Sequence, residues 1–490
     1  MKTKKMVSRI TALVLTACVV LTGCSFGKSE QTSTDTYEIV WYNEGDNTKD
    51  KDLVNKEINE YLKEKIGATV KIIHFSAADY AEKTKLLLAS GEVFDMCSVA
   101  ANSYGQNAEN GAYLPIDRLL ETHGKDILEL MPEEMWNAVK YKGEIYGVPT
   151  IKDWGTQYVI GCNKQLTDKY NIDLSNIKSL ADMESILADI KEKEPTVYPT
   201  DIRGNDYVKR LLPFEYISDS VLGAFEKDGD YTKVVNWIET DTAKEFFDMM
   251  HRWYEKGYLR PDADTATTSN DITFFMNCTE MIPYQEQQYN AARTADKQRY
   301  FVNVGDSIVT TNYVQSALQA ISRTSKNPEK TMEFLNMLYT DKYLLNLYVY
   351  GIEGKHYTLE NEGTTVKYPE GVMNFTENDY YATAAAQGNR YLLNIPPNTP
   401  TDIWDAYKKF NEESFISPAL GFVFDISELS AEIAAMNNVY KEYMPALTTG
   451  VSDPETELPK AIKKFKAAGS DKVFKELQRQ YDEWKKINKN

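Results

Sequence analysis

The sequence contains few residues of the types that hold metals or cross-link a fold. Five cysteines occur in 490 residues, and the three that follow Cys24 are widely spaced, without the pairing of a disulfide framework or a zinc site. The four histidines, His74, His123, His251 and His356, are also far apart. Short acidic triplets such as Asp262-Ala263-Asp264 do not match an EF-hand and are more typical of turns. We therefore expect no metal and no cofactor, although folding could still gather distant ligands.

Basic residues are outnumbered by acidic ones. The chain has 55 Lys and Arg against 73 Asp and Glu, a formal net charge of -18. Binding to phosphates requires a concentrated basic surface. An acidic balance of this size usually reflects only a well-solvated surface. Nucleic acid is therefore excluded as an expected partner.

A long apolar run is also missing. The run from Ile10 to Leu21 is shorter than the roughly 20 residues that a membrane-spanning helix needs. It follows the basic segment 1–9, and this layout predicts a signal peptide over residues 1–23. Leu21-Thr22-Gly23-Cys24 resembles the lipobox of bacterial lipoproteins, which implies a diacylglyceryl group on Cys24. Two acyl chains hold a protein stably at a membrane, so we expect an anchor at the outer face of the cytoplasmic membrane.

The Ser- and Thr-rich residues 24–36 predict a flexible tether between the anchor and the folded part. The rest of the chain is too long for one compact core. At its beginning, short runs of apolar residues alternate with segments in which apolar residues recur at helical spacing. This predicts strands at Tyr37–Tyr42, Ala68–Phe75 and Phe94–Val99, and helices at Asp52–Ile66 and Asp79–Ser90. Such an order indicates a parallel, doubly wound sheet with right-handed crossovers.

Open parallel sheets bind ligands beyond the carboxyl ends of their strands. Trp41, Asn43, Glu44 and Tyr104 follow such ends and are candidate ligand-binding residues. An equally strong alternative is that Trp41 packs in the core and Asn43 belongs to a turn.

Later segments are mostly helical. Residues 142–149 indicate a hairpin, and amphipathic periods predict helices near 179–191, 243–256, 327–339 and 471–487. From Thr401 onward the chain is expected to be largely helical.

Four motifs occur in the order found in extracellular solute-binding proteins of sugar importers, the family 1 type. Ala317–Asp341 resembles the family's strand, "S-x-N-P-E" turn and helix, and Leu86–Asp95 resembles its first helix and next strand. Asn110–Asp117 and Ile145–Pro149 resemble its "G-x-x-x-x-L-D" and "Y-G-[LVI]-P" elements. Residues 417–425 resemble a subgroup of large binding lipoproteins with an extended C-terminal region.

The resemblance implies an α/β fold of the two-lobed periplasmic-binding-protein type, type II, in which each lobe is a sheet flanked by helices. The expected N-terminal lobe comprises residues 37–149 plus about 300–345. The C-terminal lobe comprises 150–299 plus about 346–490, including a mostly helical C-terminal region. The resemblance further implies a monomer that captures an oligosaccharide in the interlobe cleft and delivers it to an ABC permease.

A sugar site needs flat aromatic faces for the rings and polar groups for the hydroxyls. The chain has 33 tyrosines and seven tryptophans. Besides the four residues above, the candidates are Trp154 and Tyr158, which follow the first crossover, and Glu286, Glu353 and Arg390 in polar segments.

An enzyme is the main alternative function. The sequence has no G-x-S-x-G elbow and no H-E-x-x-H motif. Glycoside hydrolysis needs only two carboxylates, which a count of 73 acids does not exclude. We expect no enzymatic activity, with a surface glycoside hydrolase as the less favoured alternative. A peptide or another polar solute is the second ligand class, and a lipoprotein that binds other proteins or wall polymer is a third possibility.

Overall fold

The computed structural model describes residues 36–99, 103–204, 208–217, 222–383 and 387–488. The predicted signal peptide, Cys24 and most of the predicted tether lie outside these ranges. Within them, no helix combines the length and the apolar character needed to cross a bilayer. The cysteines in this part of the chain, Cys97, Cys162 and Cys278, are free.

The first sheet has the strand order β2-β1-β3-β15-β6. Its strands are β1 (Tyr37–Glu44), β2 (Ala68–Phe75), β3 (Met96–Ser98), β6 (Val148–Pro149) and β15 (Leu318–Ile321). β1 is parallel to β2 and β3, as the alternating pattern predicts, whereas β15 is antiparallel to both β3 and β6. The sheet is therefore mixed, because β15, a strand from much later in the sequence, is inserted between β3 and β6.

The two helices between these strands are α1 (Lys51–Ile66) and α2 (Ala77–Ser90), close to the predicted ranges. α1 ends at Gly67, whose left-handed φ of 63° lets its backbone N–H donate to the Lys63 carbonyl. Further helices of this part are α3 (Tyr104–Glu109), α4 (Asp117–His123), α5 (Lys125–Leu130), α6 (Glu133–Asn137), α12 (Pro328–Thr340) and α13 (Lys342–Tyr350). The predicted hairpin is present as β4 (Lys140–Tyr141) and β5 (Glu144–Ile145).

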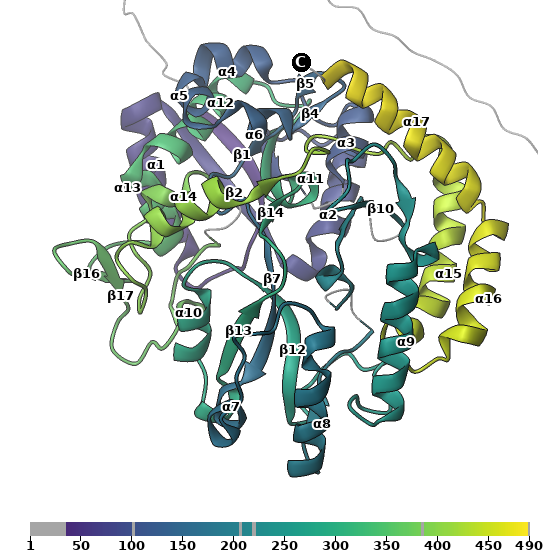
Figure 1. Cartoon of the computed structure of the whole chain (residues 1–490). Coiled ribbons are helices and arrows are strands. Elements are labelled where there is room, and N and C mark those ends of the chain that lie inside the picture. Colours follow the sequence, from purple (N-terminus) through teal and green to yellow (C-terminus); the bar gives the residue numbers. More distant parts are fainter. Residues whose placement is uncertain (1–35, 100–102, 205–207, 218–221, 384–386, 489–490) are drawn as a thin grey trace, which may run out of the picture. The chain divides into compact units, whose positions relative to one another are not determined.

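The second sheet has the order β13-β7-β12-β8. Its strands are β7 (Gln157–Asn163), β8 (Tyr198–Thr200), β12 (Phe274–Met281) and β13 (Arg299–Asn303). It carries α7 (Lys164–Tyr170), α8 (Glu184–Lys193), α9 (Asp241–Glu255) and α10 (Gln285–Ala291), and a small sheet of β9 (Phe214–Tyr216), β10 (Gly223–Glu226) and β11 (Val235–Asn236). Figure 1 shows the two larger sheets as separate groups of strands.

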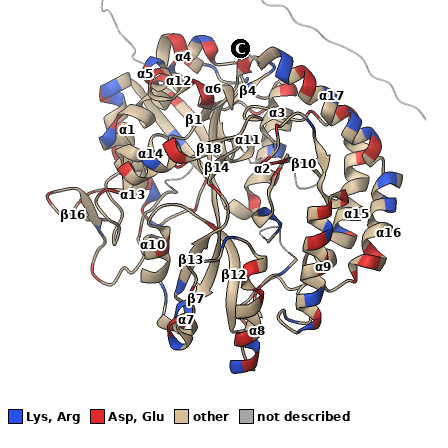
Figure 2. Ribbon diagram, in the orientation of Figure 1, with Lys and Arg blue, Asp and Glu red and all other residues tan. Residues whose placement is uncertain are grey.

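The C-terminal region is helical, as predicted. It contains α14 (Ile403–Glu413), α15 (Ser430–Thr448), α16 (Pro454–Ala467) and α17 (Ser470–Asn488). The apolar face of α17 buries Val473, Leu477 and Tyr481. α15 and α16 contact α9, so the yellow helices of Figure 1 pack beside the second sheet. Acidic and basic side chains are interspersed along the outer helices in Figure 2, which is typical of solvated helix faces.

The buried apolar side chains form two main cores. The first core gathers residues between Ile39 and Trp154 with others between Val309 and Leu420, and the second gathers residues between Ile160 and Val304 with others between Ala419 and Tyr481. Burying large apolar surfaces is the main favourable term in folding, so core membership defines the folding units.

This packing differs from the predicted lobe boundaries in two places. β13 pairs with β7 and so belongs to the second sheet, although residues from about 300 were assigned to the N-terminal lobe. The segment 346–393 was assigned to the C-terminal lobe, but α13 buries Tyr348 and Val349 in the first core. The physical reason is that α13 is apolar on most faces and packs against α1 and α12.

Three stretches of chain connect the two cores: residues 150–156, 304–310 and 414–420, here called the crossing segments. They also bond to one another. β14 (Ile308–Val309) pairs in parallel with β18 (Phe415–Ile416), and Thr156 forms an antiparallel bridge to Ile308. The helix α11 (Thr311–Gln315) follows the second segment, and a peripheral hairpin of β16 (Thr358–Glu360) and β17 (Thr365–Lys367) follows α13.

Candidate functional site

Charged and aromatic side chains gather at the crossing segments. Asp153, only 2% exposed, accepts hydrogen bonds at both carboxylate oxygens. Arg390 Nη1 donates to Oδ1 at 2.7 Å, and the Tyr313 hydroxyl donates to Oδ2 at 3.1 Å. The carboxylate is thus held in place by partners from two other parts of the chain.

Lys152, beside this carboxylate, has a different environment. Its residue surface is 7% exposed, and its Nζ lies 4.3 Å from the centroid of the Tyr313 ring. That ring contact is a cation–π interaction. Burial lowers the pKa of Lys152, although the nearby carboxylates of Asp153 and Glu280 act in the opposite direction.

Glu280 approaches from the second sheet. It stands opposite Tyr158 in the antiparallel register of β12 and β7, so the two side chains lie on the same face. Lys227 Nζ lies 5.5 Å from the centroid of the Tyr158 ring. Burial raises the pKa of Glu280, and the positive charges of Arg210 and Lys152 oppose this effect.

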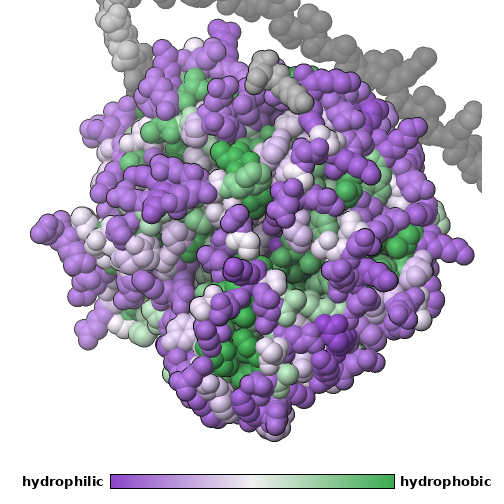
Figure 3. Space-filling model, viewed as in Figure 1, coloured by the Kyte–Doolittle hydropathy of each residue, from purple (hydrophilic) through white to green (hydrophobic). Residues whose placement is uncertain are grey.

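We call this group of side chains the crossover cluster. It comprises Lys152, Asp153, Tyr158, Lys227, Glu280, Tyr313 and Arg390. Beside it, β18 exposes two apolar side chains, Phe415 at 43% and Ile416 at 44%, and the Tyr231 ring lies 6.3 Å from that of Phe415. In Figure 3 the middle of the visible face is hollowed and partly apolar. Aromatic faces, ammonium donors and carboxylate acceptors together suit a ring that carries many hydroxyls.

Three of the sequence-predicted site residues lie at or beside this cluster. Tyr158 and Arg390 belong to it. Trp154 is 7% exposed, and its indole N–H donates to the Thr150 carbonyl at 2.9 Å. Its backbone N–H donates to Asn411 Oδ1 at 2.7 Å, so Trp154 holds the first crossing segment against α14. Direct contact of these three with a ligand stays a prediction.

Trp41 and Asn43 require a correction, because both are completely buried in the first core. The indole N–H of Trp41 donates to Gln319 Oε1 at 2.9 Å. Asn43 donates to the Tyr348 hydroxyl and accepts from Gln387 Nε2 at 2.9 Å. Their polar atoms are satisfied inside the protein, so both residues belong to the first core and do not face a ligand.

Tyr104 is likewise a core residue, with 1% of its surface exposed. Its hydroxyl donates to the Val139 carbonyl and accepts from the backbone N–H of Tyr146 at 2.9 Å. Burial raises its pKa well above the ordinary value. The Tyr104 side chain therefore joins α3 to the hairpin of the first core. The prediction that it contacts a ligand is corrected in the same way.

The remaining predicted residues lie apart from the crossover cluster in their contacts. Glu44 is exposed at the end of β1, and Glu353 is exposed in the loop after α13. Glu286 on α10 is half-buried, which raises its pKa, and its polar neighbours are the Phe301 backbone and Lys164. For these three residues, ligand binding stays a prediction.

The sequence analysis missed Lys152, Asp153, Lys227, Glu280 and Tyr313. One local signal was available: Lys152 and Asp153 are adjacent charges between apolar strands, directly before the predicted Trp154. The other three carry no local signal, since they reach the site only through strand pairing and core packing.

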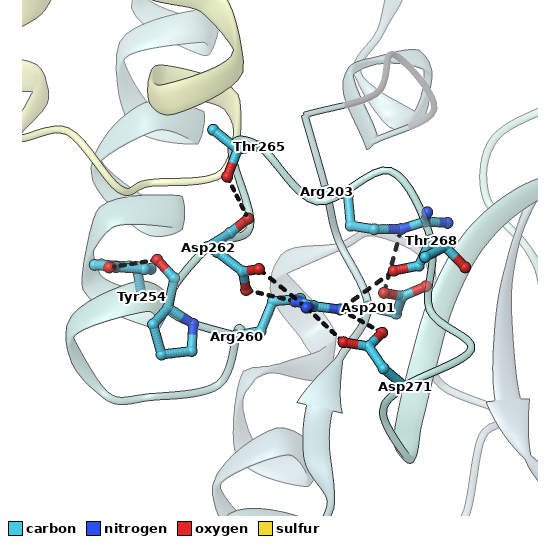
Figure 4. Close-up of polar contacts among 9 residues, drawn as sticks. Asp201, Arg203, Tyr254, Arg260, Asp262, Thr265, Thr268 and Asp271 are labelled. Atoms are coloured by element: carbon cyan, nitrogen blue, oxygen red, sulfur yellow. Dashed lines mark hydrogen bonds and ion pairs between the residues drawn. The ribbon is translucent and has the colours of Figure 1, made fainter.

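The carboxylates of the acidic turn at Asp262 are paired with the side chain of Arg260. Arg260 bonds in two-pronged fashion to the carboxylates of Asp262 and Asp271, at distances between 2.6 and 3.0 Å, and Nη1 also donates to the Thr268 carbonyl (Figure 4). Such planar pairing is the geometry that arginine favours. Among the described residues, no group of three or more His, Cys, Asp or Glu side chains is arranged to hold a metal.

A second concave surface lies beside α7 and β13. This pocket of 850 Å³ is lined by Thr167, Asp168, Asn171, Ile172, Leu174, Ser175 and residues 300–303. At its edge the Tyr300 hydroxyl donates to Asp168 at 2.9 Å. We favour the crossover cluster, because it combines buried charges with residues from both cores, whereas this pocket is built from the second core alone.

The fold and the sequence together define the class. Residues 56–352 match the model of the bacterial extracellular solute-binding proteins, and the chain belongs to this family. Residues 418–486 match a domain of unknown function. The chain thus has the two-lobed α/β fold of these proteins, with helices flanking each sheet and a helical C-terminal region.

Three matches, one by sequence and two to solved structures of the same protein, specify this further. A carbohydrate ABC transporter substrate-binding protein of Streptococcus pneumoniae is 33% identical over 97% of this chain and 96% of its own length. The crystal structure of the N-glycan transport solute binding protein NgtS from Streptococcus pneumoniae has a TM-score of 0.83 and 31% identity, covering 93% of this chain and all of that one. Its complex with Man5GlcNAc has a TM-score of 0.71 at the same identity and coverage.

Proposed function

We propose that this chain is the extracellular substrate-binding lipoprotein of an ABC importer that captures a mannose-containing oligosaccharide. The observation that supports this most strongly is the similarity to NgtS along nearly the whole chain, since NgtS is solved with Man5GlcNAc. The crossover cluster supplies matching chemistry, because it lies where the two cores meet. The cores act as the two lobes, and the glycan binds between them and brings them together.

The binding test uses the purified mature chain without its leader. Isothermal titration and thermal unfolding are measured with Man5GlcNAc and with gluco-, xylo- and galacto-oligosaccharides. Binding stabilises the folded state by an amount that grows with ligand concentration, so Man5GlcNAc should raise the melting temperature. Stabilisation by peptides and by no glycan would refute the oligosaccharide and favour the second ligand class.

The protein should bind the glycan without cleaving it. A glycosidase needs two carboxyl groups free to act on one bond. In the crossover cluster both oxygens of Asp153 are already engaged by Arg390 and Tyr313. Chromatography of Man5GlcNAc after long incubation should show the intact glycan only, and multiple turnovers would establish a hydrolase instead.

The lipid anchor and the permease partner belong to the same proposal. The lipobox pattern at the end of the leader supports a lipid on Cys24. In cells fed a labelled fatty acid, the wild-type chain should carry label and sediment with membranes. Cys24→Ala should release the protein to the outside without label. Equal membrane binding by both forms would refute lipidation, and co-purification with the transmembrane subunits in the presence of glycan tests the partner.

A further inference from the structure

Lys152 and Glu280 carry polar groups whose bonding capacity is not met by the residues that the structure describes. Lys152 follows β6 of the first sheet, and Glu280 lies on β12 of the second. Within the described ranges, neither side chain forms a hydrogen bond or an ion pair, and Lys152 contacts the Tyr313 ring. Lys152 lies five residues before Gln157 of β7, which pairs with Met281 beside Glu280, so the two residues lie at the same end of the second sheet. Each charge also affects the pKa of the other.

This arrangement leaves polar groups available to a ligand. The Lys152 residue is largely buried, and its ammonium group has three hydrogens to donate. No hydrogen bond or ion pair joins Lys152 to the adjacent carboxylate of Asp153, which accepts from Arg390 and Tyr313. A donor group on one side and an acceptor group on the other are thus left facing the region between the cores.

We propose that Lys152 and Glu280 together bind hydroxyl groups of one sugar residue, Lys152 donating and Glu280 accepting, so that the bound glycan joins the two lobes. This rests on the proposed function and assigns the polar contacts of its site. A neutral sugar fits best, because a hydroxyl both donates and accepts. A uronic or sialic acid would instead bring a carboxylate towards Glu280. The Tyr158 and Tyr313 rings, which already lie against lysines, are placed to flank the sugar.

The test compares Lys152→Met and Glu280→Gln, which keep the side-chain size and remove the charge. Lys164→Met is the matched control. Lys164 also lies over a tyrosine ring, 4.2 Å from the centroid of Tyr300, but it pairs with Asp168 at the edge of the α7–β13 pocket. Circular dichroism confirms the fold of each variant before titration with Man5GlcNAc, and Glu280→Gln carries the test if Lys152→Met does not fold.

Each of the two variants should weaken binding about tenfold or more, since a hydrogen bond to a charged group is worth at least that much. Lys152→Met should not lower the melting temperature of the unliganded protein, because it removes a largely buried charge that has no hydrogen bond or ion pair with the described residues. Replacing a residue that only supports the fold would instead lower the melting temperature and leave the affinity for the glycan unchanged. The double variant should lose less than the product of the single losses, as expected for two groups that hold the same sugar.

Three results would overturn the inference. If the wild-type chain binds Man5GlcNAc and both variants bind it equally well, the contacts are misassigned. If Lys164→Met alone weakens binding, the glycan occupies the pocket beside α7 and β13. If Lys152→Met loses stability and affinity in parallel, Lys152 is a structural residue. Failure of the wild-type chain to bind any glycan would instead refute the proposed function itself.

Discussion

Replacing Arg390 by methionine should destabilise the protein strongly, because it leaves a buried carboxylate without its main partner. The Asp153 side chain is 3% exposed and that of Arg390 is 19% exposed, with 2.7 Å between Nη1 and Oδ1. Breaking a buried pair from one side costs roughly 3–5 kcal/mol. Since the Tyr313 hydroxyl still donates to Asp153, we expect about 3 kcal/mol for Arg390→Met.

The free energy of unfolding is measured by urea denaturation followed by near-ultraviolet circular dichroism. Adding Asp153→Asn to Arg390→Met should recover most of the loss, because no uncompensated charge is then buried. The control is Arg479→Met on α17, whose partners Glu476 and Glu483 lie on the same helix with side chains 30% and 56% exposed, so its loss should cost at most about 1 kcal/mol. The reasoning is refuted if Arg390→Met is as mild as Arg479→Met, or if Asp153→Asn brings no recovery.

Two further perturbations follow from the charges of the second core. A hydrogen bond from Arg252 lowers the pKa of Glu184 from 4.5 to about 2. Burial acts in the opposite direction, and a hydrogen bond from Lys256 lowers the pKa further. The stabilisation is therefore present at neutral pH and is lost as the pH falls from about 4.5 towards 2. Glu184→Gln should cost about 1 kcal/mol in urea denaturation at pH 7 and progressively less at lower pH, and a gap independent of pH would contradict this. Arg260→Met should speed deuterium uptake in residues 262–271, where the guanidinium bonds hold the turn, and unchanged exchange would count against that role.

The regular elements were predictable because their signals are local. The helix expected at Asp52–Ile66 is found at Lys51–Ile66, and β2 has the predicted bounds. Apolar periodicity and a capping glycine act within one turn or one strand. The place of β15 between β3 and β6 was not predictable in this way, because its partner β3 lies more than 200 residues earlier in the chain.

The candidate site shows the same division. The sequence indicated aromatic and polar residues after strand ends, but not which of them face inward. The side chain of Asn43 is occupied by hydrogen bonds with Tyr348 and Gln387, which are more than 300 residues away in the sequence. Lys152 and Glu280 approach each other only because two sheets meet at the crossing segments. Such contacts between distant residues leave no spacing pattern that a single sequence can reveal.

The insertion of β15 between β3 and β6 also governs how the protein can fold while it is exported. A chain that leaves the cell from its N-terminus presents β1, β2 and β3 long before residues 318–321 have crossed the membrane. Until then β3 has an open edge, and open strand edges readily pair with other chains. If the chain is exported as proposed, this edge stays open until the second half of the polypeptide has crossed the membrane.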